Sequence, residues 1–315
     1  MTTEPSLKTV TRTQGNNRAL KQGLVQPRGY RLEFEEVPVL IDAFRRMVRS
    51  LDYDVCEMAL TTYICAREHG RRFTALPIFL VRAFHHGGIV VRRDGDFRRP
   101  GDLQGQRVGV SRGYTVTSGL WSRAVLEEEH GIDLSRITWV LSGDEHVQEY
   151  RPPANVVPSP IGRTLTEQLL AGEIAAVIGG EADHPDVTAL IPRPQDAGLK
   201  ALRERGHYPI NHLVVVRDDI LERDPDAAAT LFDAFVASKR IYLEQLAAGT
   251  LGEETGADRT HRRVAELIGD PLPYGIESNR ATLETILDHC KTQGITRERL
   301  RVDDLFAVAT RGLAG

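Results

Sequence analysis

The sequence contains few sulfur-bearing and few aromatic residues. Its 315 residues include three cysteines, three methionines and 6% aromatic residues. The cysteines Cys56, Cys65 and Cys290 are odd in number and have no CxxC spacing, so neither a disulfide framework nor a zinc site is indicated. With 41% hydrophobic residues, the chain also falls outside the collagen-like, disordered and small disulfide-rich classes.

A basic excess and a long apolar run are also absent. Lysine and arginine total 40 against 44 aspartate and glutamate, for a net charge of −4, whereas nucleic acids are bound by clustered basic residues. No run approaches the roughly 18 apolar residues of a membrane span. The first residues lack the charged and apolar regions of a secretory signal. We therefore expect a cytoplasmic protein that binds neither nucleic acid nor a membrane.

Strand-like and helix-like segments alternate along the chain without a repeat or low-complexity tract, a pattern typical of an α/β protein. The length suits two domains, each with its own hydrophobic core. The helix that precedes Gly131 is predicted to end at that glycine. The clearest strand patterns cover residues 7–11, 30–35, 73–80, 107–110, 137–141, 174–178 and 212–216.

Unusual polar residues follow several predicted strands, and ligands of open α/β sheets gather at the carboxyl ends of strands. Asn16 lies in the turn at residues 14–18, for which a helix cap is the plainer interpretation. Glu57 falls within an apolar strand-to-helix junction. For this carboxylate a structural hydrogen bond and a ligand contact both remain open.

A third strand end holds Arg82, His85 and His86. Adjacent histidines on an extended chain point to opposite sides and suit a metal ion poorly. One of them could instead donate a proton, and Arg82 could pair with a carboxylate. The alternative is a surface histidine and a structural arginine.

The fourth strand end, residues 111–118, leads into a predicted helix start. Its backbone N–H groups and the hydroxyls of Thr115, Thr117 and Ser118 predict an anion site that fits a small carboxylate. The dinucleotide, P-loop, GxSxG and HExxH motifs are all missing from the sequence, which excludes the sites they build.

Two more histidines are weaker candidates. His146 and Glu149 could form an acid–base pair, although a solvated turn is the plainer interpretation. His212 opens an apolar strand, where a lone histidine is more often structural.

Taken together, the sequence segments that carry these residues resemble the 4,5-dihydroxyphthalate decarboxylase family, a branch of the type II periplasmic-binding-protein-like superfamily. The likeness runs nearly from end to end of the chain. The strings around Glu57 and His146, and the string from Tyr274 to Arg280, are the most particular. The matching segments are residues 44–47, 52–60, 84–86, 102–110, 114–121, 146–150, 169–174, 208–212, 273–280, 293–295 and 305–306.

The resemblance implies an α/β protein with a two-lobed type II periplasmic-binding-protein-like fold, two crossing hinge strands and a ligand cleft between the lobes. Residues 1–87 and 209–315 would form lobe I, and residues 88–208 an inserted lobe II. The crossings would be residues 88–91 and 208–216. Residues expected at this hinge are Arg82, His85, His86, Asn211 and His212.

The resemblance also implies a cofactor-independent and metal-independent decarboxylase of a hydroxylated aromatic carboxylate similar to 4,5-dihydroxyphthalate, in aromatic compound catabolism. A ring hydroxyl would push electrons to the carboxyl-bearing carbon, a general acid would protonate that carbon, and CO2 would leave. We expect His86 or His212 as the acid and Glu57 or His146 as the group that polarises the phenol. The expected substrate-binding residues are Arg82, His85, Arg112, Tyr114, Thr115, Thr117, Ser118, Asn16 and Asn211.

The chain departs from the family pattern in three places. Residues 14–17 lack a basic side chain, an additional residue brings in Arg112, and His85 stands where Arg or Gln is usual. These departures leave the substrate open. The alternatives are a cytoplasmic solute-binding or sensor protein for a small carboxylate, or a different reaction on the same scaffold. Whether the chain forms a homo-oligomer is open as well.

Overall fold

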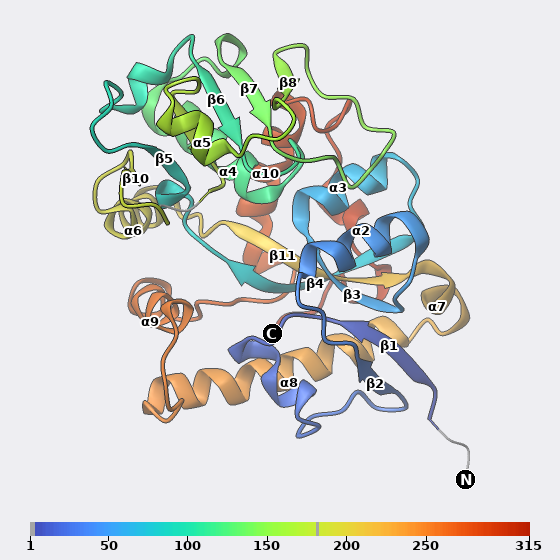
Figure 1. Ribbon diagram of the computed structural model, residues 1–315. Coiled ribbons are helices and arrows are strands. Elements are labelled where there is room, and N and C mark those ends of the chain that lie inside the picture. Colours follow the sequence, from blue (N-terminus) through green and yellow to red (C-terminus); the bar gives the residue numbers. More distant parts are fainter. Residues whose placement is uncertain (1–3, 181–182) are drawn as a thin grey trace. The chain divides into compact units, whose positions relative to one another are not determined.

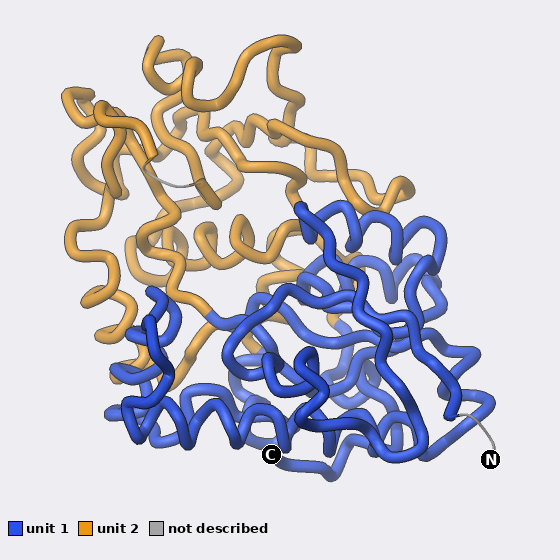
Figure 2. Tube along the Cα trace, turned by 60° about the horizontal axis from the view of Figure 1, so that its bottom comes forward, with its two compact units in different colours: residues 1–82, 210–284, 300–315 blue, residues 83–209, 285–299 orange. Residues whose placement is uncertain are grey.

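The computed structural model describes residues 4–180 and 183–315 (Figure 1). The chain divides into two compact units, coloured separately in Figure 2. Unit 1 comprises Met1–Arg82, Ile210–Glu284 and Leu300–Gly315, and unit 2 comprises Ala83–Pro209 and Thr285–Arg299. Each unit is an α/β structure around its own sheet, in agreement with the predicted fold class.

The described part of unit 1 contains a five-stranded sheet in the order β2-β1-β3-β11-β4. Strands β1, β2 and β3 are parallel, and β11 is antiparallel to both β3 and β4. The strands of this sheet are β1 (Ser6–Val10), β2 (Arg31–Phe34), β3 (Val55–Ala59), β4 (Phe73–Arg82) and β11 (Ile210–Arg217). The helices are α1 (Arg18–Lys21), α2 (Leu40–Ser50), α3 (Leu60–Glu68), α7 (Asp218–Arg223), α8 (Ala227–Ala248) and α9 (Gly256–Ile268).

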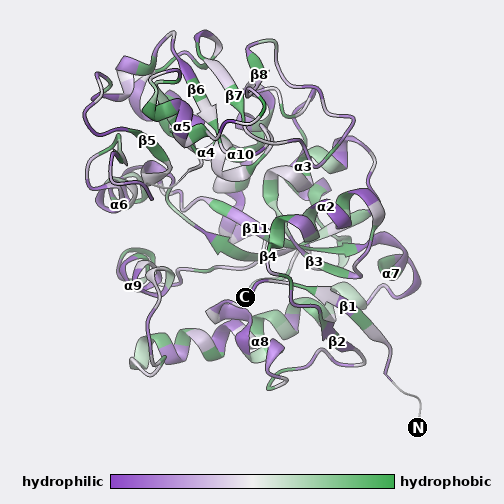
Figure 3. Cartoon of the chain, in the orientation of Figure 1, coloured by the Kyte–Doolittle hydropathy of each residue, from purple (hydrophilic) through white to green (hydrophobic). Residues whose placement is uncertain are grey.

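Helix α2 illustrates how the sequence builds this unit. Its apolar residues recur at helical spacing, so that Leu40, Phe44, Met47 and Val48 are all buried, while its other side is polar. Figure 3 shows both hydrophilic and hydrophobic colours on this helix. Leu51 adopts a left-handed conformation (φ 54°) and ends it.

The described part of unit 2 contains a six-stranded sheet in the order β10-β5-β9-β6-β7-β8. Gly131 ends α4 in the left-handed conformation (φ 65°), as predicted. The strands of this sheet are β5 (Ile89–Arg92), β6 (Arg107–Val110), β7 (Thr138–Leu141), β8 (Val156–Pro158), β9 (Ala176–Ile178) and β10 (Val187–Ala189). The helices are α4 (Thr117–His130), α5 (Leu165–Leu170), α6 (Pro194–Arg205) and most of α10 (Arg280–Thr292).

Short 3-10 helices punctuate the loops of both units. They are η1 (Gly15–Asn17), η2 (His86–Gly88), η3 (Pro100–Leu103), η4 (Leu134–Arg136), η5 (Glu277–Asn279), η6 (Val302–Leu305) and η7 (Val308–Thr310). No helix within residues 4–180 and 183–315 is both long enough and apolar enough to cross a membrane.

The chain passes between the units at residues 82–83, 209–210, 284–285 and 299–300. Residues 88–91 lie in unit 2, where β5 pairs with β9 and β10, so they are not a crossing strand. The expected crossing at residues 208–216 does contain the passage from Pro209 to Ile210, after which β11 pairs within the unit 1 sheet. Thr285–Arg299 was expected in lobe I but belongs to unit 2, where Gln293 accepts a hydrogen bond from buried Arg123 at 2.7 Å and Tyr150 donates one to the Gly294 carbonyl at 3.0 Å.

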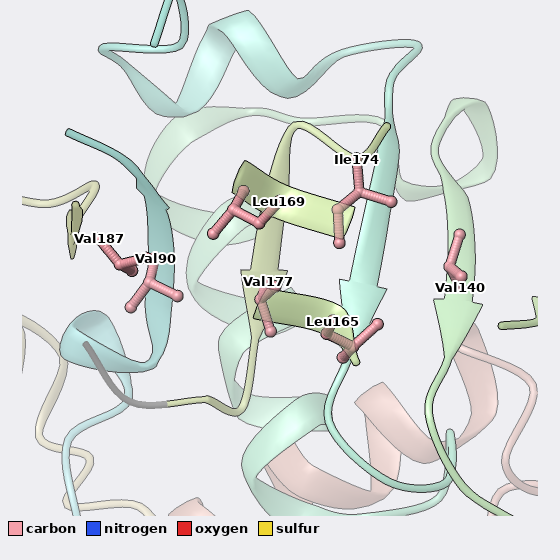
Figure 4. Packing of buried hydrophobic residues seen from close by; sticks show 7 residues of the cluster. All are labelled: Val90, Val140, Leu165, Leu169, Ile174, Val177 and Val187. Atoms are coloured by element: carbon pink, nitrogen blue, oxygen red, sulfur yellow. The ribbon is translucent and has the colours of Figure 1, made fainter. Parts of the chain in front are cut away.

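A hydrophobic cluster of unit 2 packs α5 against the sheet (Figure 4). Its buried members are Val90, Val140, Leu165, Leu169, Ile174, Val177 and Val187. We expect Ile174→Val to lower the free energy of unfolding by about 0.5–1.5 kcal/mol, because one buried methyl group is lost. Urea denaturation measures this, with Ile161→Val as the matched control because Ile161 is fully exposed. Equal effects at the two positions would contradict the packing role of Ile174.

Candidate functional site

Polar side chains gather at one edge of the unit 1 sheet. Because β1, β3 and β4 run in the same direction, their carboxyl ends meet there, together with the start of antiparallel β11. Glu57 comes from β3, Arg82 ends β4, and His212 lies near the start of β11. This is the edge at which ligands of open α/β sheets usually bind.

The carboxylate of Glu57 is fully buried and accepts four hydrogen bonds. The Arg12 backbone N–H lies 2.9 Å from Oε2, and the Gln14 side-chain amide lies 3.1 and 3.2 Å from the two oxygens. The ring Nδ1 of His212 lies 2.6 Å from Oε1. A buried carboxylate in this position holds Nδ1 protonated and fixes the orientation of the imidazole.

His212 is held from a second side while its ring still reaches solvent. Phe44 of α2 packs edge-on against the ring, with centroids 5.2 Å apart, and the side chain is 22% exposed. The sequence indicated Glu57 and His212 as two separate candidates, and for His212 a structural role was the plainer interpretation. The structure brings the two together as one hydrogen-bonded pair.

A cavity of about 170 Å³ lies within unit 1, and its lining includes neighbours of Glu57 and His212 but neither of these two residues. Gln14 belongs to the cavity wall and also donates to Glu57, while Val81, another wall residue, is the strand partner of His212. Directly paired residues of neighbouring strands point to the same face. The full lining is Thr13, Gln14, Gly15, Asn16, Arg18, Leu80, Val81, Arg82, Thr255, Ala257, Asp258 and His261.

Arg82 and Asn16, both predicted ligand-binding residues, share the wall of this cavity. Arg82 is 6% exposed, and its guanidinium donates to the Pro273 carbonyl at 3.2 Å and to the side-chain oxygen of Asn279. These two contacts orient the guanidinium. Asn16 does not cap η1. The N-cap residue is Gln14, whose backbone N–H donates to Oδ1 of Asn17 at 2.8 Å as part of a capping box.

Unit 2 contains a second histidine–glutamate pair. His86 is 3% exposed, and its Nε2 lies 3.0 Å from Oε1 of Glu129. Its Nδ1 is buried and has no hydrogen-bond partner within the described residues. His86 and the neighbouring His85 line a small cavity together with Glu128 and Glu129. The ring of His86 is therefore much less accessible than that of His212.

The predicted anion site at the start of α4 binds a carboxylate of the chain itself. Glu145 accepts hydrogen bonds from the backbone N–H groups of Tyr114 and Thr115 and from the Thr115 hydroxyl, the last at 2.6 Å. Thr117 and Ser118 are the first two residues of α4. The loop before them makes a sharp turn at Arg112, which adopts φ 72° and donates its backbone N–H to Ser142 Oγ at 2.8 Å.

We expect Glu145→Gln to lower the free energy of unfolding by about 1 kcal/mol. Hydrogen bonds to an ionised acceptor are about twice as strong as those to a neutral one. The control is Glu204→Gln, which removes only an exposed pair with Lys200, and such pairs contribute little. Thermal unfolding of both variants compares them. An equal shift in the two would show that the Glu145 contacts add no more than a surface pair.

The remaining predicted residues lie in different places. His146 is in the loop after β7 and is 4% exposed, so the solvated-turn interpretation is wrong for it because its ring is packed inside unit 2. Asn211 lies at an irregularity in the pairing of β11 with β4. Within the described residues, no group of three or more His, Cys, Asp or Glu side chains could hold a metal ion.

Several cavity residues were not predicted. Gln14 was noted as part of the turn at residues 14–18 and as a departure from the family pattern, but not as a site residue. Asp258 and His261 were not noted at all. Asp258 and His261 are three residues apart on α9, a spacing that places them on one helical face. That spacing was the only feature of the sequence that could have indicated the two residues as a pair, and it is common in helices of proteins with any function.

No family model matches the chain. A 4,5-dihydroxyphthalate decarboxylase from Comamonas testosteroni is 32% identical over 286 residues, covering 85% of this chain and 86% of that protein. The structure is similar to the periplasmic aliphatic sulphonate binding protein SsuA from Escherichia coli, with TM-score 0.54, 13% identity and coverage of 99% and 100%. It is also similar to the desulfurization enzyme DSZB, with TM-score 0.53, 15% identity and 96% coverage of each chain. The structural matches show that the fold is periplasmic-binding-protein-like.

Proposed function

The chain belongs to the 4,5-dihydroxyphthalate decarboxylase family, and from this premise we propose that it removes one carboxyl group, as CO2, from a hydroxylated aromatic carboxylate. The observation that supports this most directly is the Glu57–His212 pair beside a cavity lined by Arg82. A positioned proton donor and a fixed cation are the two groups that such a reaction needs. The substrate is of the 4,5-dihydroxyphthalate type, with at least one hydroxyl para to the carboxyl group that is lost.

In the proposed reaction the ring hydroxyl gives its proton to water, and its electron pair moves through the ring to the carboxyl-bearing carbon. That carbon takes a proton from His212, and a dienone forms. The bond to the carboxylate then breaks, its electron pair returns to the ring, and CO2 leaves. The phenolate takes a proton back from solvent, and His212 also regains its proton from solvent, so that one proton is consumed per turnover. The ring hydroxyl serves as the electron source, so the reaction is written without a cofactor.

His212 is the better choice of acid than His86 for two reasons. Its ring is partly exposed while its Nδ1 is held by Glu57, so Nε2 can face a ligand. His86 is almost fully buried against Glu129. Glu57 then acts through His212 as a positioning residue, because its two oxygens are already engaged by Arg12, Gln14 and His212.

Arg82 is the proposed partner of a substrate carboxylate. Arg82 lines the cavity and donates hydrogen bonds to Pro273 and Asn279, which orient its guanidinium. A guanidinium matches the geometry of a carboxylate. The volume of the cavity suits a single ring, since a cavity of about 150 Å³ can hold benzene.

The test is to incubate the purified protein with hydroxylated benzoates and phthalates and to follow CO2 release. The proposal expects release from at least one of them and none from the corresponding compounds without a ring hydroxyl. A ligand that raises the melting temperature without forming product would instead support a solute-binding protein. That alternative has the same fold in its favour, because SsuA is a binding protein.

A further inference from the structure

Helix α9 brings a third histidine to the wall of the unit 1 cavity. His261 and Asp258 both line the cavity. Neither belongs to the Glu57–His212 pair that the proposed reaction uses. The ring of His261 is 9% exposed and packs edge-on against Tyr242 of α8, with centroids 5.9 Å apart. The proposed reaction therefore does not explain why a histidine lies in the wall of this cavity.

The hydrogen bonds around His261 determine which ring nitrogen carries the proton. The Tyr242 hydroxyl donates to Oδ1 of Asp258 at 2.6 Å, and the same hydroxyl oxygen lies 2.8 Å from His261 Nδ1. A tyrosine hydroxyl has one proton, and here it goes to the carboxylate. Nδ1 must then be the donor to the tyrosine oxygen, which leaves Nε2 with a lone pair when the ring is neutral.

The ring is neutral and Asp258 is ionised at physiological pH. Burial lowers the pKa of His261 to about 4, and although Asp258 opposes this, the Arg82 guanidinium lowers it further. Burial pushes the pKa of Asp258 upward, but hydrogen bonds from Tyr242 and Thr255 outweigh it, so its pKa lies below the usual value. His261 is thus a fixed hydrogen-bond acceptor and a poor base.

A second acceptor faces the same cavity. The side-chain nitrogen of Asn16 donates to the Leu80 carbonyl at 3.0 Å and to the Tyr274 hydroxyl at 3.1 Å. Because a carbonyl can only accept, this assigns the nitrogen to that side. Asn16 Oδ1 remains buried without a partner among the described residues, and Asn16 is 2% exposed. An unpaired buried acceptor is costly, so a donor that reaches Asn16 Oδ1 would be bound favourably.

We propose that His261 is a specificity-determining residue, whose Nε2 accepts a hydrogen bond from a ring hydroxyl of the bound aromatic carboxylate, with Asn16 Oδ1 as a second acceptor. The inference rests on the proposed function for the class of ligand. It adds the residues that distinguish a hydroxylated ring from one of the same size without a donor. Tyr242 and Asp258 are positioning residues, since they act only by fixing the proton on His261.

A matched pair of ligands tests this without turnover. Loss of one carboxyl group from 4,5-dihydroxyphthalate leaves 3,4-dihydroxybenzoate, and 3,4-difluorobenzoate has the same carboxylate with substituents that cannot donate. In calorimetric titrations at pH 7 we expect the wild-type protein to bind the dihydroxy compound about tenfold or more tightly, because the fluorinated ligand leaves acceptors unpaired. In His261→Phe the ratio should fall towards one, with affinity for 3,4-difluorobenzoate unchanged.

Tyr242→Phe supplies a second readout, since it keeps the ring of residue 242 and removes only the hydroxyl that fixes the tautomer. The ratio of affinities for the two ligands in Tyr242→Phe should lie between the ratios of wild type and His261→Phe. If His261→Phe does not fold, this variant tests the role of His261 in its place. A wild-type ratio near one, a ratio unchanged in His261→Phe, or no binding of 3,4-dihydroxybenzoate by the folded protein would overturn the inference. Failure of the proposed function is distinguishable, because it would appear as absent CO2 release with the binding ratio intact.

Discussion

Decarboxylation should slow by about 10²- to 10⁴-fold in His212→Gln, which is the range of effect for removing a general acid. Glutamine can still donate to Glu57, so the buried carboxylate keeps a partner and the fold is preserved. It has no proton that it can give to a ring carbon. Single-turnover CO2 release, measured with the protein in saturating excess over the substrate, isolates this step from binding.

The matched control for His212→Gln is His86→Gln. His86 is also paired with a glutamate, but its ring is buried in unit 2, so the same substitution there should leave the chemical step within a few-fold of wild type. If His86→Gln proved the slower variant, the acid would be assigned to the wrong histidine. Intact turnover in the double variant would remove both histidines from the mechanism.

Replacing Arg82 by Gln should raise KM by about 10- to 100-fold, with a smaller change in kcat. A hydrogen bond that involves a charged group contributes about 1.5–3 kcal/mol, and each 1.4 kcal/mol corresponds to about tenfold in affinity. Arg82→Lys should recover only part of the loss, because an ammonium group cannot form the two parallel hydrogen bonds that a guanidinium makes. Steady-state kinetics on all three proteins measures the effect.

Arg18 provides the comparison for Arg82. It lines the same cavity but is exposed, so solvent screens its charge and Arg18→Gln should change KM only a few-fold. A larger effect at Arg18 than at Arg82 would mean that the carboxylate binds at the outer wall. An unchanged melting temperature in Arg82→Gln would show that the loop carrying Asn279 has kept its place.

Local features of the fold were predictable from the sequence because they depend on nearby residues. Gly131 ends α4 because glycine has no Cβ and therefore adopts the left-handed conformation easily. Helix α2 and the strands β1, β2, β4, β6, β7, β9 and β11 follow from the apolar spacing of their residues, whereas β8 was not predicted. The strings shared with the decarboxylase family then indicated the architecture that the structural matches show.

The site itself was only partly predictable, because its contacts are long-range. Glu57 stood out as a carboxylate within an apolar strand, but His212 lies 155 residues further along the chain. Nothing in either segment shows that β11 returns to pair between β3 and β4. His146 was misjudged as a turn residue because burial depends on what packs over a loop. Thr285–Arg299 was assigned to the wrong part for a similar reason, since only its contacts in unit 2 reveal its place.

The fold alone does not separate an enzyme from a binding protein, since SsuA and DSZB share it. The Glu57–His212 pair is the reason for proposing catalysis. It holds one nitrogen of the histidine and leaves the ring partly exposed, an arrangement that proton transfer to a ligand requires.

The most direct test of this account is to run the reaction with 4,5-dihydroxyphthalate in deuterium oxide and to examine the product by proton NMR. The account predicts 3,4-dihydroxybenzoate with a single deuterium, on the ring carbon ortho to the remaining carboxylate and para to a hydroxyl, formed at a greatly reduced rate by His212→Gln. Substrate recovered unchanged from the folded wild-type protein, or a product whose formation does not depend on His212, would contradict it.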